Sequence, residues 1–353
     1  MTGLLLTTVL LMSVSSVSAS PPTYQDTTDT RKEIQISNLS SSFLPDDQLQ
    51  NMIEHAKEVL NEVKSENTLS LQSIDRSYQY IYLPTDPSEI SYVYEEPLGG
   101  APQLTLLDSN IGTDSYTPNS LPTDQTDFIS DGVGGRIYIT PSGSSSSYLS
   151  TSLKLPADSE VIPNTAAYNY IGFTASNVES DFGTVYVTTA GPNSTEKGWR
   201  VAVTLKINGS KVTMNPVSPY NQMWNKNAYL SNSTVVLYTW YNYSGKARLK
   251  VDGTATCADN ACTNSANTSL TSVFESGVIG SSGLSSISNW KLLSTVVSSN
   301  NTGKNKAIFS NIKINGTAVP SSSFGTPQQD HAYITRDSSN TVTIDVDSSK
   351  YPL

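Results

Sequence analysis

Apolar and polar side chains alternate in the stretch Arg200-Val-Ala-Val-Thr-Leu-Lys-Ile-Asn-Gly209, which ends on a turn pair. A period of two places the apolar side chains on one face of an extended strand and the polar ones on the other. Asn-Gly tolerates positive φ at both positions, which a type I′ turn requires. Together with Val212 and Met214, which follow, the stretch predicts an antiparallel hairpin.

The same pattern recurs along the second half of the chain. Alternating segments flank Ser244-Gly245 and Asn315-Gly316, and Asp252-Gly253 predicts a further turn. Shorter alternating runs occupy residues 136–140, 149–155, 184–188 and 341–346. No helical period of useful length follows residue 125. The sequence therefore predicts an all-β fold over residues 126–353, an antiparallel β-sandwich of the jelly-roll type.

The composition is that of a weakly charged, acidic protein. Charged residues make up 15% of the 353 residues, where about a quarter is usual. The formal net charge is −10, and clusters of Lys and Arg that would bind nucleic acid or an anionic lipid surface are missing. No Gly-rich phosphate loop joins a strand to a helix. We expect no nucleic-acid partner and no cofactor.

The first 19 residues have the features of a cleavable export signal. Residues 4–17 are mostly apolar, and Val17-Ser18-Ala19 places small residues before a cleavage site predicted after Ala19. The apolar stretch is too short for a membrane span, and no later segment is suited to one. The sequence predicts a secreted, extracellular protein whose mature form has no membrane span.

Between the signal and the sandwich lie two further segments. Residues 20–45 are rich in Ser, Thr, Asp and Pro and predict a flexible leader. Residues 46–125 predict a small helical and mixed segment. Its helix, over about 46–65, follows from apolar residues at helical spacing between Leu49 and Val63, after the start signal Pro45-Asp46-Asp47.

The predicted helix has an apolar face that requires a covering surface. We expect it to dock within the chain, on the sandwich or on a short strand pair at about 78–83 and 90–94. One alternative is a partner protein. Another is that the segment is a removable pro-segment, because Pro, Gly and Asp crowd residues 97–127, where a protease could reach extended backbone.

The two cysteines of the chain are Cys257 and Cys262, separated by four residues. In an oxidising compartment they predict a disulfide that pins one short surface loop. The alternative is a pair of free cysteines without a role. No metal site is expected, because zinc needs four ligands and the two histidines, His55 and His331, lie far away in the sequence.

Acidic residues offer weak candidates for catalysis. Glu179 and Asp181 lie two positions apart, so both carboxylates face the same side of an extended strand. A retaining glycosidase needs such a pair about 5 Å apart. The run lacks the third acidic residue and the Trp that sandwich glycosidases carry, so a solvated strand edge is the preferred interpretation. Asp345 and Asp347 have no downstream residue that would complete a metal site.

Aromatic residues give the better functional hypothesis. Tyr220, Trp224 and Tyr229 lie in a polar, Asn-rich stretch, and rings held beside amides offer a sugar a flat apolar face together with hydrogen bonds. We predict that these three residues bind a ligand and that Trp224 is exposed. Trp199 and Trp240 are assigned to the core.

The predicted sandwich carries a set of short runs rich in Gly, Asp and β-branched residues. They are Asp131-Gly-Val-Gly-Gly-Arg-Ile-Tyr-Ile-Thr-Pro-Ser-Gly143, Glu179-Ser-Asp-Phe-Gly183 with Gly198-Trp199, Lys246-Ala-Arg-Leu-Lys-Val-Asp-Gly253, and Asp330-His331 with Thr341-Val-Thr-Ile-Asp-Val346. These runs resemble the YrpD-like secreted proteins of Bacillus and relatives over about residues 127–350. The resemblance implies secretion by a Gram-positive bacterium and no particular activity.

A second resemblance concerns fold style alone. Ala307-Ile-Phe-Ser-Asn-Ile-Lys-Ile-Asn-Gly316 is similar to strands of concanavalin-like and laminin-G-like jelly rolls. This likeness favours contact with carbohydrate by analogy.

Three functions follow, in order of preference. The first is an exported, non-catalytic sandwich that binds an extracellular polysaccharide or cell-wall component. The second is a structural or adhesive extracellular protein that binds other proteins. The third is a glycan-cleaving hydrolase that uses Glu179 and Asp181.

Overall fold

The structure is a computed structural model of the chain. It describes residues 34–38, 44–68, 76–86, 88–107, 132–140, 147–162, 165–187, 198–214, 227–257, 267–280, 284–298 and 301–351. The predicted signal at 1–19 lies outside these residues.

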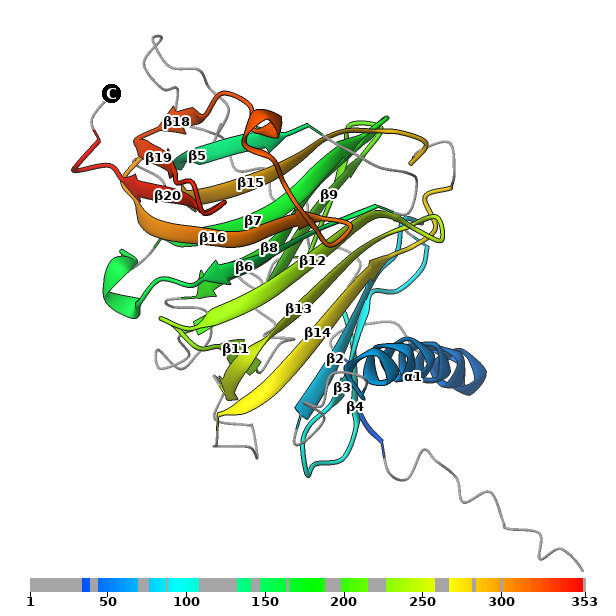
Figure 1. The fold of residues 1–353 in the computed structure, drawn as a ribbon. Coiled ribbons are helices and arrows are strands. Elements are labelled where there is room, and N and C mark those ends of the chain that lie inside the picture. Colours follow the sequence, from blue (N-terminus) through cyan, green and yellow to red (C-terminus); the bar gives the residue numbers. More distant parts are fainter. Residues whose placement is uncertain are drawn as a thin grey trace, which may run out of the picture.

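Two β-sheets pack face to face, and one long helix lies on the outside of the first sheet (Figure 1). The first sheet contains, in spatial order, β1 (Gln35–Asn38), β4 (Gln103–Leu106), β3 (Tyr92–Glu96), β2 (Arg76–Leu83), β14 (Thr268–Ser276), β13 (Lys246–Cys257), β12 (Thr234–Tyr243), β6 (Tyr148–Lys154), β16 (Lys304–Ile314), β20 (Val342–Asp347) and β19 (Ala332–Arg336).

The second sheet faces the first across the core. Its order is β18 (Gln328–Asp330), β5 (Gly132–Ile139), β15 (Ile287–Val297), β7 (Ala166–Ala175), β8 (Val178–Val187), β9 (Gly198–Ile207) and β10 (Ser210–Met214). The short β11 (Asn227–Tyr229) pairs with both β13 and β9 and so joins the two sheets. The two-residue β17 (Thr317–Ala318) pairs with β16. Single 3-10 turns form at Asp158–Glu160 and Ser321–Ser323. The predicted all-β sandwich is confirmed.

The three predicted tight turns have the expected backbone. Asn208-Gly209, Ser244-Gly245 and Asn315-Gly316 have positive φ at both positions, between 51° and 82°. These are the dihedral signs of type I′ turns, which suit the right-handed twist of the flanking strands. Each turn joins two consecutive antiparallel strands.

The turn predicted at Asp252-Gly253 is wrong, because β13 continues through both residues to Cys257. Asp252 pairs with Val236 on one side and Thr271 on the other, as an ordinary strand residue does. A Cβ atom at position 253 would lie 2.7 Å from the Val235 side chain and 2.9 Å from the Tyr229 ring. Glycine is therefore needed here for close packing rather than for a turn.

The main core lies between the two sheets. Its centre is a group of aromatic side chains in edge-to-face contact, formed by Phe173, Phe182, Tyr241, Phe274 and Trp290. Such contacts add about 0.5–1.5 kcal/mol per pair to the stabilisation from burial itself. The alternating strands supply these side chains from one face each, as the sequence pattern predicts.

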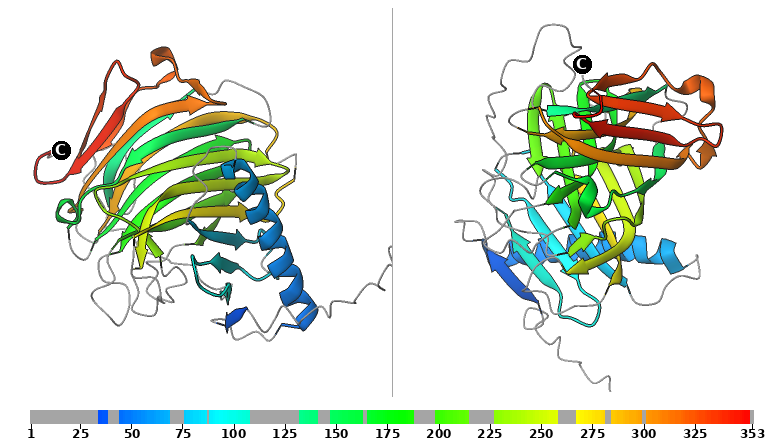
Figure 2. Two further views of the ribbon diagram at one scale, coloured as in Figure 1. Left: turned by 60° about the horizontal axis from the view of Figure 1, so that its bottom comes forward. Right: turned by 90° about the vertical axis from the view of Figure 1, so that its left-hand side faces the viewer.

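The helix α1 (Asp46–Thr68) covers the outer face of β2, β3 and β14 (Figure 2). Acidic Asp46 and Asp47 occupy its first turn, where their charges interact favourably with the positive end of the helix dipole. Its buried stripe packs against a second core that contains Tyr80, Tyr92, Tyr94 and Val273. The prediction that the helix docks within the chain is confirmed. Among the described residues, no helix combines the length and apolar character needed to cross a membrane.

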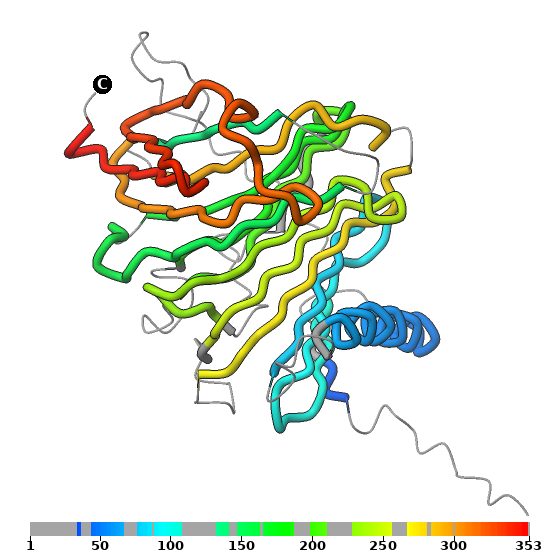
Figure 3. Tube along the Cα trace, in the orientation of Figure 1, coloured from blue at the N-terminus to red at the C-terminus, as the bar shows by residue number. Residues whose placement is uncertain are grey.

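The strand pair next to α1 belongs to the first sheet. β2 pairs antiparallel with β3, as expected, and also pairs in parallel with β14 along eight residues. The backbone of residues 76–83 therefore continues the sheet of the sandwich (Figure 3). Sequence patterns within one strand cannot reveal a parallel partner nearly two hundred residues away.

Candidate functional site

Four aromatic side chains form a strip on the outer face of the first sheet. Tyr148 on β6 lies directly across from Trp240 on β12, and Tyr238 lies two residues before Trp240 on the same face. The rings of Tyr238 and Trp240 stack with centroids 6.0 Å apart, and Tyr148 and Tyr243 lie 5.4 Å and 5.9 Å from Trp240. All four are partly exposed. We call Tyr148, Tyr238, Trp240 and Tyr243 the aromatic strip.

Two cations of the neighbouring strand β13 hold the strip in place. The guanidinium of Arg248 lies 4.0 Å from the ring centroid of Tyr243 and 5.6 Å from that of Trp240. The ammonium of Lys250 lies 4.7 Å from the ring of Tyr238. Each such cation–π contact contributes about 0.5–2 kcal/mol, more where the cation is desolvated. The side chains of Arg248 and Lys250 are only 3% and 10% exposed, so their contacts are formed out of water.

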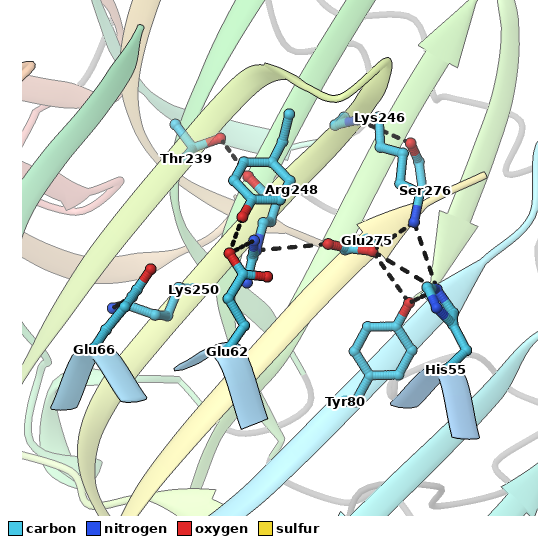
Figure 4. Close-up of polar contacts among 12 residues, drawn as sticks. His55, Glu62, Glu66, Tyr80, Thr239, Lys246, Arg248, Lys250, Glu275 and Ser276 are labelled. Carbon is cyan, nitrogen blue, oxygen red and sulfur yellow. Dashed lines mark hydrogen bonds and ion pairs between the residues drawn. The ribbon is translucent and has the colours of Figure 1, made fainter. Parts of the chain in front are cut away.

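The helix α1 supplies acidic partners for these cations (Figure 4). Glu62 lies 3.6 Å from Arg248 and accepts a hydrogen bond from the Tyr243 hydroxyl. Glu66, one helical turn later, accepts a hydrogen bond from Lys250 at 3.3 Å. Residues four apart lie on the same helix face, which explains why both reach β13. Burial and the hydrogen bond to Glu62 raise the pKa of Tyr243 to about 12.

A buried carboxylate completes the cluster between α1 and the sheet. Glu275 on β14 lies 2.8 Å from the Lys246 ammonium and 3.7 Å from the Arg248 guanidinium. It also accepts a hydrogen bond from the Tyr80 hydroxyl at 3.3 Å, and His55 of α1 lies 4.0 Å away (Figure 4). Burial and the Lys246 ammonium hold the pKa of His55 below its ordinary value, against the opposing effect of Glu275 and Glu58.

The cations that border the strip are matched by carboxylates. Lys246 pairs with Glu275, Arg248 with Glu62 and Glu275, and Lys250 with Glu66 and with Asp252 at 3.9 Å. Glu62 and Glu66 are about half exposed, so their outer oxygens can accept hydrogen bonds from a ligand. Arg76, 3.0 Å from Asp252, balances the fourth carboxylate, so the strip offers ring faces and hydrogen-bond acceptors beside paired charges.

The two tryptophans assigned to the core have different positions. Trp199 is fully buried and packs on Tyr186, as predicted. Trp240 is partly exposed on the outer face, so its assignment to the core is wrong. Its strand alternates buried Val235, Leu237, Thr239 and Tyr241 with the outward residues. This alternation shows that the strand has two different faces. The set that begins with Val235 and Leu237 is the more apolar one, and this could have identified it as the buried face from the sequence.

Of the predicted ligand-binding residues, Tyr229 is in the core. It is 1% exposed, and its hydroxyl lies 3.0 Å from the Val251 carbonyl oxygen and 2.9 Å from the Ser272 hydroxyl oxygen, the two acceptors within reach of its single proton. Ser272 in turn donates to Gln79, whose amide donates to Glu95. Tyr229 therefore belongs to a buried polar chain and offers no ring face to solvent. Tyr220 and Trp224 lie outside the described residues.

The paired acids Glu179 and Asp181 lie on the outer face of the second sheet, on the same side of β8, as predicted. Both carboxylates lie 2.8 Å from the ammonium of Lys291, which is 1% exposed. Lys291 reaches Asp181 across Gly172, which pairs with both residues and has no side chain in the way.

The electrostatics of this cluster favour an ionised Glu179 beside a charged Lys291. Burial alone would raise the pKa of Glu179, but Lys291 and Lys206 outweigh burial and lower it. Burial alone would lower the pKa of Lys291, but Asp181 and Glu179 raise it. A glycosidase acid needs a raised pKa so that it holds a proton at neutral pH. The environment of Glu179 therefore does not favour a role as general acid.

The remaining candidates carry little chemistry. Cys257 ends β13, and Cys262, with the predicted disulfide between them, lies outside the described residues. Asp345 accepts hydrogen bonds from Lys350 and Tyr351, and Asp347 accepts one from Ser349. Within the described ranges, no three His, Cys, Asp or Glu side chains are gathered closely enough to hold a metal ion.

Fold and site together define a class: a two-sheet β-sandwich whose first sheet is extended and covered by an N-terminal helix, with an aromatic strip on its outer face. Residues 126–346 match the domain of unknown function YrpD, and the chain belongs to this family. It is 29% identical over 191 residues to the uncharacterized protein YrpD of Bacillus subtilis (strain 168), a match that spans 54% of this chain and 70% of that protein.

Solved structures with some likeness include peptidases. Scytalido-glutamic peptidase, crystallised with a transition state analog inhibitor, is 11% identical with a TM-score of 0.35, and the match covers 61% of this chain and 98% of that one. SCP-B, a member of the Eqolisin family of peptidases in complex with a tripeptide, is 12% identical with a TM-score of 0.32 and the same coverage.

Proposed function

We propose that this protein is an exported glycan-binding sandwich that holds a neutral polysaccharide on its aromatic strip. The observation that carries the proposal is the presence of four partly exposed rings on one sheet face, three of which contact Arg248 or Lys250. Stacking on a sugar requires flat apolar faces whose orientation does not change on binding. Export is supported by the signal-like residues 1–19.

The charges around the strip favour a neutral ligand. The cations beside the rings already have carboxylate partners, and the half-exposed Glu62 and Glu66 would repel an anionic polymer. Sugar hydroxyls, in contrast, are good donors to these carboxylates. A neutral glycan therefore satisfies both the ring faces and the acceptors beside them.

The test is affinity electrophoresis of the mature protein in gels that contain neutral polysaccharides, with polygalacturonate as the anionic comparison. We expect retardation by at least one neutral polymer, and a loss of affinity of about ten-fold or more in Trp240→Ala, which corresponds to about 1.4 kcal/mol. Tyr138→Ala is the matched control. Tyr138 is also partly exposed and held by a cation, Arg136, but lies in the second sheet.

Three outcomes would contradict the proposal. The first is an affinity of Trp240→Ala equal to that of the wild type, with a folded far-UV spectrum. The second is binding to polygalacturonate alone. The third is capture of cell-surface protein that soluble glycan does not compete with, which would favour the adhesive function. Trp224→Ala is measured in parallel, because loss of binding in that variant alone would assign the ligand to the Asn-rich stretch.

A further inference from the structure

A second pair of aromatic rings lies at the far edge of the first sheet. Tyr333 on β19 is 52% exposed, and its ring stacks on Tyr351 with centroids 5.8 Å apart and an interplanar angle of 28°. The Tyr351 hydroxyl donates to Asp345 at 2.8 Å, and Lys350 donates to the same oxygen at 2.9 Å while its ammonium lies 4.6 Å from the Tyr351 ring. The pair is thus fixed in orientation, and Tyr333 remains open to solvent.

The strand register places this pair on the same face as the aromatic strip. Residues directly opposite each other in paired strands point to the same side of a sheet. Tyr238 pairs with Ser150 of β6, and Ser152, two residues later on that strand, pairs with Ser310 of β16. Lys306 of β16 pairs with Asp345 of β20, and Asp345 pairs with Tyr333. Each step keeps to the outer face.

The surface between the two aromatic groups is rich in hydroxyls. Along β6, β16, β20 and β19 it presents Ser152, Ser310, Thr343 and Thr335, all partly or fully exposed, together with the partly exposed Lys154, Lys306 and Ile308. Four strand spacings separate β12 from β19, which is roughly 19 Å across the sheet. A single sugar cannot contact both groups, whereas a polymer chain can.

We propose that a neutral polysaccharide binds in extended form across the outer face of the first sheet, with the aromatic strip as one contact and the Tyr333–Tyr351 pair as a second. This inference rests on the proposed function. The two contacts act on one chain, so the second is formed at a high effective concentration once the first is occupied. Affinity then depends on chain length, and only chains that reach β19 gain from Tyr333.

The test uses short and long oligosaccharides of the neutral polymer that retards the protein, measured by calorimetry. For the wild type we expect affinity to rise steeply once the oligosaccharide spans both contacts. Tyr333→Ala should bind short oligosaccharides like the wild type and lose about ten-fold for long ones. The matched control is again Tyr138→Ala, which should change neither.

The outcomes separate the two proposals. If the wild type and Tyr333→Ala have equal affinity at every length while Trp240→Ala loses binding, the extended track is wrong and the aromatic strip stands. If no neutral glycan binds the wild type at all, the proposed function fails together with the track. A loss in Tyr333→Ala that is the same for short and long oligosaccharides would also contradict the second contact.

Discussion

The outer faces of the two sheets both carry a basic side chain buried among carboxylates, with different results. On the second sheet, the Lys291 ammonium lies 2.8 Å from both Glu179 and Asp181, so its charge is paired within the cluster. On the first sheet, Arg248 contacts both the carboxylates of Glu62 and Glu275 and the rings of Trp240 and Tyr243.

This difference distinguishes a stabilising cluster from a candidate site. Carboxylates and rings occupy different directions around a guanidinium, since its edge donates hydrogen bonds and its flat face stacks. Arg248 can therefore contact two rings that remain partly exposed to solvent. Lys291 is a point charge that contacts the two carboxylates at 2.8 Å each.

The largest effect should follow from Lys291→Met. The substitution leaves two partly buried carboxylates side by side with only the half-exposed Lys206 near Glu179, and removing one partner of a buried ion pair costs about 3–5 kcal/mol. Because Glu179 and Asp181 retain some exposure, we expect about 3 kcal/mol, measured by urea unfolding. Glycan affinity should not change.

Lys206→Met is the matched control for this cluster. Lys206 contacts Glu179 at 3.5 Å but is about half exposed, so its loss should cost well under about 1 kcal/mol. A Lys291→Met protein as stable as the wild type would contradict the stabilising role. A loss of glycan binding in a folded Lys291→Met protein would remove the distinction between the two faces.

Sequence patterns predicted the strands well because each strand has one buried face. Two local properties are the alternation of apolar and polar residues in β9 and the positive φ angles at the turn that follows it and at two further turns. The aromatic strip is not local, because Tyr148 and Trp240 are brought together only by the β6–β12 pairing. The role of α1 was likewise hidden, since its apolar stripe predicted docking but Glu62 and Glu66 could be given partners only once β13 lay beside them.

A smaller effect should follow from Glu62→Gln, which tests whether α1 orders the strip. Arg248 keeps Glu275, so we expect a loss of stability below about 1 kcal/mol, in the range of exposed ion pairs. Tyr243 loses its charged acceptor, and glycan affinity should fall about three-fold, well short of the effect of Trp240→Ala. Calorimetry of the same polymer measures this change.

Glu54→Gln provides the comparison on the same helix. Glu54 is exposed and accepts a hydrogen bond from Gln50 within α1, so the substitution should leave glycan affinity unchanged. Equal affinities of Glu62→Gln and the wild type would show that the rings keep their orientation without the helix. In that case Arg248 alone would orient the rings of Trp240 and Tyr243.

The smallest effect is the dependence of stability on pH. It differs between His55, in the cluster under α1, and Glu179, in the cluster on the second sheet. His55 faces Lys246, Glu275, Glu58 and the Tyr80 hydroxyl, and its pKa in the folded protein lies below the ordinary value of 6.5. The folded state therefore binds this proton less readily than the unfolded state, so the contribution to stability is complete above about pH 6.5 and decreases as the pH falls below it.

Glu179 titrates in a separate range. Its folded pKa lies below the ordinary 4.5, so its contribution is present above pH 4.5 and is lost only as the pH falls through the lowered value. Lowering the pH from about 7 to 5 should thus reduce the free energy of unfolding of the wild type slightly more than that of His55→Gln, because only the wild type carries the imidazole beside Lys246. Urea unfolding at each pH measures this difference. Parallel curves for the two proteins over that range would mean that the cluster under α1 does not resist the charge on His55.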